Sequence, residues 1–100
     1  MPALVLARAA QNDLEDIARY TEAQWGAEQK QRYMSALADR FIQLTNTPEM
    51  GLARDDIKTG YRSLLAGRHV IFYRHANNRL EISRVLHERM DLHRHLADEG

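Results

Sequence analysis

The sequence predicts an α+β fold, in the order β-α-α-β-β-β, with two helices packed as an αα-hairpin on one face of an antiparallel sheet. Two consecutive segments, residues 10–24 and 27–45, carry apolar residues at helical spacing. Farther along the chain, two β-branched and aromatic runs, residues 67–74 and 80–87, flank a short polar turn. The 100 residues, of which 44% are hydrophobic and 28% charged, suit one globular domain spanning residues 1–100.

The chain begins with a short apolar run, residues 3–7. This run is too short for the core of a signal peptide or for a membrane span, so we expect a buried first strand. An amphipathic helix follows, in which Asn12 and Glu15 stand in the register of a capping box, although the pattern also allows a start at Ala9. The positions that form its apolar stripe are Leu14, Ile17, Ala18, Thr21 and Trp25.

Gly26 should end the first helix, because glycine adopts the left-handed conformation without a steric cost. A second helix then begins at Ala27 and ends before Pro48, and so short a link requires an antiparallel helical hairpin. We interpret Tyr20 and Trp25 as aromatic residues packed in this hairpin rather than as a surface for stacking bases. The apolar stripe of the second helix comprises Met34, Leu37, Phe41 and Leu44.

The second half of the chain predicts a meander of three strands. Residues 49–60 have neither a helical nor a strand period and should form a connecting loop. A short strand at residues 61–65 and a tight turn at Ala66 and Gly67 lead into the two long runs, which are joined by the polar turn at residues 75–78. Residues 91–96 could add one short helical turn at the C-terminal side.

Composition excludes several classes of function. Lysine plus arginine equals aspartate plus glutamate, 14 each, so the chain as a whole has no net charge with which to bind nucleic acid. The absence of cysteine excludes disulfides and thiolate chemistry and suits a reducing cytoplasm, where we expect the protein to act. His93 and His95 point apart on a helix, and Asp55 and Asp56 fit a capping role in a loop. We therefore expect neither a metal nor a cofactor.

The predicted strands carry an unusual number of basic residues. Strand alternation places Arg68 and Phe72 on one side of their strand and His69 and Tyr73 on the other, so Tyr73 and Arg68 should not converge. Arg84 interrupts an apolar face, which indicates either a buried ion pair with a carboxylate of the helical hairpin or a functional contact. The basic residues on or beside the strands are Arg62, Arg68, His69, Arg74, Arg84, His87 and Arg89.

Several short strings, spread almost from end to end, keep a specific order and spacing. They are Asp13-Leu14-Glu15-Asp16-Ile17, Tyr20, Trp25-Gly26, Pro48-Glu49-Met50-Gly51, Arg54-Asp55-Asp56-Ile57, Tyr61-Arg62-Ser63, Gly67-Arg68-His69-Val70-Ile71-Phe72-Tyr73-Arg74 and Arg84-Val85-Leu86-His87-Glu88-Arg89-Met90-Asp91. Together they resemble the ParE toxins of type II toxin-antitoxin modules, within the RelE/ParE superfamily. The resemblance implies a bacterial toxin that a ParD-like antitoxin neutralises.

The resemblance leaves two activities to choose between, because ParE toxins inhibit DNA gyrase whereas RelE toxins cleave messenger RNA on the ribosome. Cleavage needs dense positive charge and aligned acid-base groups. The neutral chain and the separation of Tyr73 from Arg68 favour gyrase inhibition by binding alone, without chemistry. A RelE-like nuclease and a degenerate toxin that only binds antitoxin and tunes operon repression stay open. The nuclease alternative would use Arg62, Arg68, Tyr73, Arg84 and His87.

Partner binding is expected on the sheet face that the helices leave uncovered, since its apolar positions would form an exposed patch in a lone monomer. An amphipathic antitoxin helix with acidic side chains would bury the patch and pair with the arginines in a hetero-oligomer. Contact with DNA would be indirect, through the antitoxin, and no membrane is involved. The candidate partner-binding residues are Tyr61, Arg62, Arg68, Val70, Phe72, Arg84, Leu86, His87 and Arg89.

Overall fold

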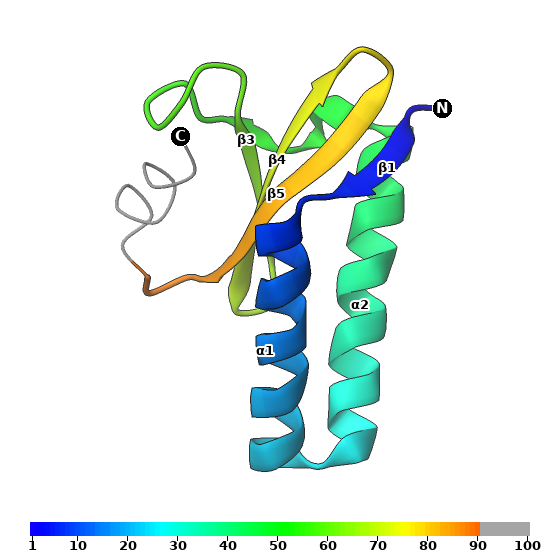
Figure 1. The fold of residues 1–100 in the computed structure, drawn as a ribbon, viewed down its shortest axis with the longest axis vertical. Helices are drawn as coiled ribbons and strands as arrows, with labels where there is room; N and C mark the ends of the chain where they lie inside the picture. Colours follow the sequence, from blue (N-terminus) through cyan, green and yellow to red (C-terminus); the bar gives the residue numbers. More distant parts are fainter. Residues whose placement is uncertain (91–100) are drawn as a thin grey trace.

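The computed structural model describes residues 1–90 and has the predicted α+β architecture, with a helical hairpin packed on one face of a five-stranded sheet (Figure 1). The strands follow the order β1-β5-β4-β3-β2 across the sheet. The helices are α1 (Arg8–Trp25), α2 (Ala27–Asn46) and the short 3-10 helix η1 (Pro48–Met50). The strands are β1 (Ala3–Leu6), β2 (Leu52–Ala53), β3 (Arg62–Ala66), β4 (His69–Ala76) and β5 (Arg79–His87).

Strands β2 to β5 form the expected antiparallel meander, but β1 pairs with β5 in parallel, so the sheet is mixed. The parallel direction of β1 and β5 follows from the way in which the chain connects the elements between them. The antiparallel helices α1 and α2 return the chain to the end of the sheet at which β1 starts, and the meander then brings β5 alongside β1 in the same direction (Figure 1). The segment expected to be only a loop, residues 49–60, also contains η1 and the two-residue edge strand β2.

The helical hairpin begins earlier than a capping box would place it. Helix α1 starts at Arg8, and its N-cap, Ala7, makes no side-chain cap hydrogen bond, so the predicted capping role of Asn12 is wrong. The start is set instead by the strand before it, because the Ala7 N–H donates to the carbonyl of Ile82 on β5. Gly26, with φ of 91°, separates the two helices as predicted.

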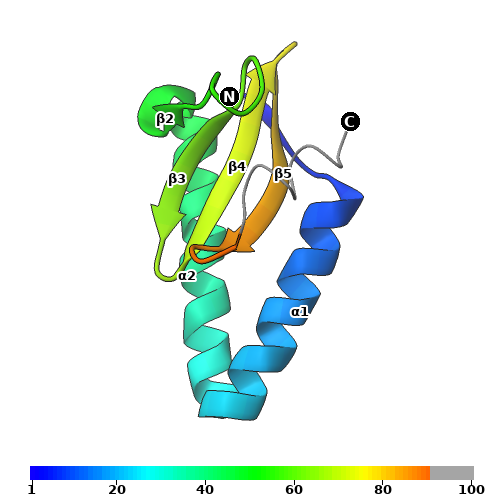
Figure 2. The ribbon, with the colours of Figure 1, turned by 90° about the vertical axis from the view of Figure 1, so that its left-hand side faces the viewer.

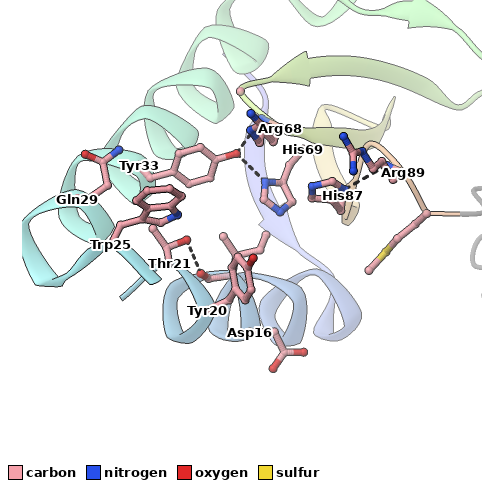
Figure 3. Close-up of a pocket in the computed structure, with 13 residues that line it drawn as sticks. Asp16, Tyr20, Thr21, Trp25, Gln29, Tyr33, Arg68, His69, His87 and Arg89 are labelled. Atoms are coloured by element: carbon pink, nitrogen blue, oxygen red, sulfur yellow. Dashed lines mark hydrogen bonds between the residues drawn. The ribbon is translucent and has the colours of Figure 1, made fainter. Parts of the chain in front are cut away.

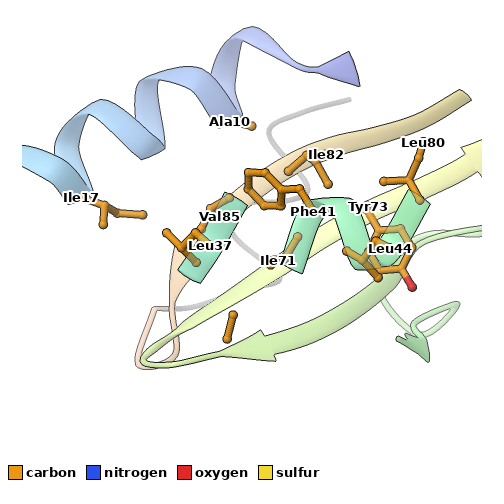
Figure 4. Packing of buried hydrophobic residues seen from close by; sticks show 11 residues of the cluster. Ala10, Ile17, Leu37, Phe41, Leu44, Ile71, Tyr73, Leu80, Ile82 and Val85 are labelled. Carbon is orange, nitrogen blue, oxygen red and sulfur yellow. The ribbon is translucent and has the colours of Figure 1, made fainter. Parts of the chain in front are cut away.

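The core lies between the hairpin and the sheet (Figure 4). Apolar residues of α1 and α2 meet Ile71 and Tyr73 of β4, which alternate as the strand pattern predicts. On β5 the expected single face is wrong beyond Ile82, because an irregularity in its pairing with β4 turns Val85 toward the helices and Leu86 to the other face. The largest side chain fully enclosed there is Tyr73. The buried residues of this cluster are Ala10, Ile17, Leu37, Phe41, Leu44, Ala66, Ile71, Tyr73, Leu80, Ile82 and Val85.

The other face of the sheet has a core of its own, so the expected exposed apolar patch is wrong for its central residues. Tyr61, Phe72 and Leu86 are at most 4% exposed, and Ile57 packs against them from the loop before β3. The guanidinium carbon of Arg54, in the same loop, lies 6.0 Å from the centre of the Phe72 ring. The loop therefore covers part of the face that alternation alone leaves open.

Two further expectations about exposure are wrong. The hairpin extends beyond the end of the sheet (Figure 2), so Tyr20 and Trp25, near its tip, are 66% and 70% exposed instead of packed. Strand β1 is an edge strand rather than a buried one, and its Leu4 is 41% exposed. The β4–β5 turn does follow prediction: Asn77 and Asn78 both have positive φ, as a two-residue hairpin turn requires. The predicted helical turn at residues 91–96 lies outside the described residues.

Candidate functional site

A groove of about 930 Å³ lies where the protruding half of the hairpin meets the end of the sheet (Figure 3). Helix α1 contributes Tyr20 and Trp25 to one wall. The opposite wall comes from the β3–β4 turn and the end of β5, with Arg68, His87 and Arg89. An aromatic wall thus faces a basic one, a combination suited to a partner that is both apolar and acidic.

Tyr33 of α2 closes the floor of this groove by bonding to the β3–β4 turn. Its Oη accepts the Arg68 N–H at 3.0 Å and lies 2.6 Å from Nδ1 of His69. Gly67, with φ of 62°, permits the contact, since a Cβ there would lie 2.8 Å from the same Oη. The His69 ring then meets that of His87 edge to face, 5.4 Å between centres. The Tyr33 hydroxyl therefore links the helical hairpin to Arg68 and His69 at the β3–β4 turn and, through the His69 ring, to His87.

The protonation state of this cluster follows from its burial. Desolvation lowers the pKa of His69, and the positive charge that His87 can carry lowers it further, against weaker opposing effects of Asp13 and Glu88. Burial raises the pKa of Tyr33. Both groups are therefore neutral near pH 7, and the short contact between Tyr33 Oη and His69 Nδ1 is a hydrogen bond between two uncharged groups.

Two guanidinium groups of the groove, those of Arg68 and Arg89, have no salt-bridge partner in the described part of the chain. Asp16, which also lines the groove, is paired with Arg19 on the outer face of α1. The groove thus presents two cations that a carboxylate from another molecule could neutralise.

Arg84, which sequence reasoning assigned either to a buried pair or to a functional contact, is held by the helical hairpin. Its Nε and Nη2 donate to the two carboxylate oxygens of Asp13 on α1 at 2.8 and 2.9 Å. The same carboxylate accepts the Val85 N–H at 2.9 Å. The predicted ion pair with a hairpin carboxylate is confirmed, and Asp13 clamps α1 to β5 just beyond the point where β1 ends.

Tyr73 and Arg62 lie at η1 and β2, away from the groove. The Tyr73 hydroxyl donates to the Pro48 carbonyl at 2.7 Å and accepts the Gly51 N–H at 2.9 Å. Arg62 donates through Nη1 to the Gly51 carbonyl at 2.9 Å. Burial raises the pKa of Tyr73, so this hydroxyl stays protonated and occupied. A Cβ at Gly51 would lie 2.6 Å from it, which shows how closely the loop packs.

The candidates for RNA cleavage therefore fall into three separate places. Arg62 and Tyr73 lie at the η1–β2 loop, Arg84 is bound by the hairpin, and Arg68 and His87 line the groove. The predicted separation of Tyr73 from Arg68 is confirmed, since Arg68 bonds to Tyr33 of α2 whereas Tyr73 bonds to the segment around η1.

The nine candidate partner-binding residues differ in how far they reach the surface. Arg68 and Arg89 are exposed, and Tyr61, Phe72 and Leu86 are buried beneath the surface that a partner would touch. The half-buried members are Arg62, Val70, Arg84 and His87. Sequence reasoning missed the groove residues Tyr20, Trp25, Tyr33 and His69 as candidates.

The described part of the chain offers neither a metal site nor a membrane-spanning helix. Residues 1–90 contain no group of three or more histidine, cysteine, aspartate or glutamate side chains placed to hold a metal ion. Neither long helix of the described region has an apolar stretch that could cross a bilayer.

The fold places the chain in a class of small α+β proteins with a helical hairpin on one face of a mixed sheet. A solved structure titled "Chromosomal ParDE TA system from P. aeruginosa" shares this fold with a TM-score of 0.76, covering 87% of this chain and 96% of that one. At 20% sequence identity, this likeness concerns the fold alone.

Sequence comparison identifies the family. Residues 4–92 match the family model described as the ParE toxin of the type II toxin-antitoxin system parDE. Toxin ParE1 of Caulobacter vibrioides is 41% identical over 92 residues, covering 92% of this chain and 95% of the relative. Toxin ParE1 of Mycobacterium tuberculosis is 40% identical over 93 residues with the same coverage, and Toxin ParE of Escherichia coli is 32% identical over 99 residues, covering 98% and 96%. The chain belongs to the ParE toxin family, as its sequence motifs predicted.

Proposed function

We propose that this ParE-family toxin inhibits DNA gyrase by binding to it, without chemistry of its own, and that a ParD-like antitoxin neutralises it. Family membership supports a toxin of a type II toxin-antitoxin system. It acts in the cytoplasm, where gyrase works, and meets DNA only through its antitoxin in a hetero-oligomer. The observation that carries the binding mechanism is the dispersal of the candidate catalytic groups over three places.

General acid-base cleavage requires groups that reach one scissile bond together. Tyr73 has both its proton and an acceptor position committed to Pro48 and Gly51. Arg84 has its charge neutralised by Asp13. Of the candidate catalytic residues, only Arg68 and His87 share a cavity, and the second imidazole there, His69, has its Nδ1 hydrogen-bonded to Tyr33. These contacts favour inhibition by binding over a RelE-like nuclease.

The groove supplies a surface for the antitoxin. Its aromatic wall, formed by Tyr20 and Trp25, offers a large apolar area, and Arg68 and Arg89 offer charge without counter-ions among residues 1–90. An amphipathic antitoxin helix that inserts apolar side chains and presents carboxylates to the basic wall would satisfy both. The candidates Tyr61, Phe72 and Leu86 belong to the core on the other face of the sheet and do not line this groove.

The activity is tested with purified toxin, gyrase and relaxed plasmid. We expect supercoiling to stop at excess toxin and to resume when antitoxin is added. Messenger RNA on translating ribosomes should stay intact. Unimpaired supercoiling together with cleaved message would transfer the assignment to a RelE-like nuclease. If neither effect occurs while antitoxin binds tightly, the degenerate, binding-only alternative is the correct one.

Charge reversal tests the groove as the antitoxin site. We expect Arg68→Glu and Arg89→Glu each to weaken antitoxin binding at least about tenfold in calorimetry, with the fold retained, because they oppose acidic side chains across the interface. Arg32→Glu is the matched control, since Arg32 is an exposed arginine of α2 that pairs only with Glu28 among the described residues. Equal affinities for all three variants would contradict this placement.

A further inference from the structure

We infer that the outer edge of β1, with the apolar groove beside it, is a self-association surface through which two copies pair β1 with β1 across a twofold axis. The surface is separate from the aromatic and basic groove described above, and the inference does not depend on the target of the toxin. It starts from the hydrogen bonds of β1.

Strand β1 uses only half of its backbone groups. The N–H groups of Ala3 and Ala7 donate to carbonyls of the β5 side, Asn78 and Ile82, each at 3.0 Å. Strand alternation then directs the N–H and C=O groups of Leu4 and Leu6 away from β5. The Leu6 carbonyl confirms this direction, since it accepts a hydrogen bond from the side chain of Gln11 at 3.0 Å. Among residues 1–90, no strand pairs with this outer edge.

Within β1, no charged side chain and no bulge guards the outer edge against pairing. Natural edge strands carry charges, bulges or inward-pointing polar groups that block association. Here β1 reads Ala-Leu-Val-Leu, and the adjoining groove of about 370 Å³ is lined entirely by uncharged apolar side chains of β1, α1 and α2. Within this surface, Leu4 is 41% exposed and Ile42 is 52% exposed. Covering these groups would remove apolar area from water.

Charge favours a second copy over an acidic partner segment. No charged side chain lines the groove, so nothing in it would hold a carboxylate. The strand it would accept is short, apolar and uncharged, and β1 is itself such a strand. The formal charge of the chain is zero, so two copies approach without net repulsion.

The geometry of a twofold pair is self-complementary. Antiparallel β1–β1 pairing lets the outward groups of Leu4 and Leu6 in one copy bond to the same groups in the other, with the Leu6 carbonyl exchanging its bond to the exposed Gln11 side chain. A twofold axis perpendicular to the sheet keeps both helical hairpins on one face. The outer stripe of α2, formed by Met34, Ala38 and Ile42 at four-residue spacing, then faces its counterpart. The result is a continuous ten-stranded sheet with two α2 helices in contact beneath it.

The test is sedimentation velocity of the full chain, free of antitoxin, from about 1 to about 200 µM. We expect the wild type to shift from monomer toward dimer as concentration rises. Ile42→Lys and Leu4→Pro should abolish the shift; the proline removes only an outward N–H and leaves the bonds to β5 intact. Leu52→Lys is the matched control, because Leu52 is 73% exposed on β2 at the opposite edge, and this variant should dimerise like the wild type.

Circular dichroism and thermal melting establish that each variant is folded. A wild type that stays monomeric throughout the concentration range would overturn the inference. Dimerisation that persists in both Ile42→Lys and Leu4→Pro would also overturn it, as would loss of dimerisation in Leu52→Lys. If the wild type is monomeric and Ile42→Lys instead weakens antitoxin binding, the groove takes an antitoxin segment and the second copy is excluded. The inference is supported if Ile42→Lys and Leu4→Pro lose dimerisation and Leu52→Lys retains it.

Discussion

Removing the carboxylate of Asp13 should cost more stability than any single surface change, because three donors depend on it. The Asp13 and Arg84 side chains are only 12% and 16% exposed, and the carboxylate also accepts the Val85 N–H. Asp13→Ala leaves a nearly buried guanidinium without its partner and a backbone donor without an acceptor.

The magnitude follows from these two losses. Breaking a buried ion pair from one side costs about 3–5 kcal/mol, and the remaining exposure of Arg84 puts this pair at the lower end. The unsatisfied Val85 N–H adds about 1 kcal/mol. We expect Asp13→Ala to lower the free energy of unfolding by about 3–4 kcal/mol, against a total of about 5–15 kcal/mol for a domain. The melting temperature should fall by about 15 °C or more.

Urea unfolding followed by far-UV circular dichroism measures the loss. Asp16→Ala is the matched control, since its pair with Arg19 is more than 70% exposed on both sides and should contribute at most about 0.5 kcal/mol. In the double variant Asp13→Ala with Arg84→Met, much of the loss should be recovered, because no buried charge is left unpaired. The reasoning is refuted if Asp13→Ala costs no more than Asp16→Ala.

Three further outcomes are expected. Tyr73→Phe should lower the free energy of unfolding by about 1–3 kcal/mol in urea titrations, because the Pro48 carbonyl and the Gly51 N–H both lose their partner; an unchanged midpoint would contradict this. Since burial lowers the pKa of His69 from 6.5, the unfolded chain binds a proton there before the folded chain does. The free energy of unfolding should therefore be highest above pH 6.5 and should fall toward pH 5. In His69→Gln this dependence on pH should be weaker when melting is followed by calorimetry. Asn78→Gly should keep or slightly raise the melting temperature and Asn78→Val should lower it, because the residue has φ of 58°; equal values for both would count against the turn assignment.

Local patterns predicted the elements well. The apolar period of residues 27–45 anticipated α2 within one residue, and Gly26 marked the boundary correctly. The polar turn between β4 and β5 was also placed correctly. In each case the signal lies within a few residues of the feature, in spacing or in backbone preference. The family followed from strings spread along the chain, which comparison with relatives confirmed.

The exposure of individual side chains was predicted less well, because it depends on how far the helices and strands extend alongside one another. Periodicity puts Trp25 on the inner face of α1, yet no strand reaches that far. The 18 residues of α1 span about 27 Å. Helix α1 starts beside Ile82, part-way along β5, and the stretch of β5 from there to its end at His87 spans only about 17 Å, so the tip of the hairpin has no sheet beneath it. The register of β1 on β5 sets this offset, and the sequence pattern does not indicate it. The cover that Ile57 gives to Phe72 had no such signal, because the loop has no period.

The site residues illustrate a second limit. Residue type alone indicated that Arg84 needs a carboxylate, but the chain has 14 acidic side chains and the pattern does not choose among them. Asp13 is the partner because the β1–β5 pairing stops at Ile82, which leaves the next stretch of β5 open to α1. Only the three-dimensional arrangement determines that choice.

The parallel pairing of β1 with β5 also determines when the protein can fold during synthesis. Asp13 and Arg84 are 71 residues apart, and β1 has no other strand as its neighbour within residues 1–90. A ribosome adding about 5–20 residues per second takes about 4–14 s to cover that distance. Until β5 emerges, α1 can pack against α2, but β1 has no strand with which to pair. The order of the strands therefore delays formation of the groove, which can form only when nearly all of the domain has been synthesised.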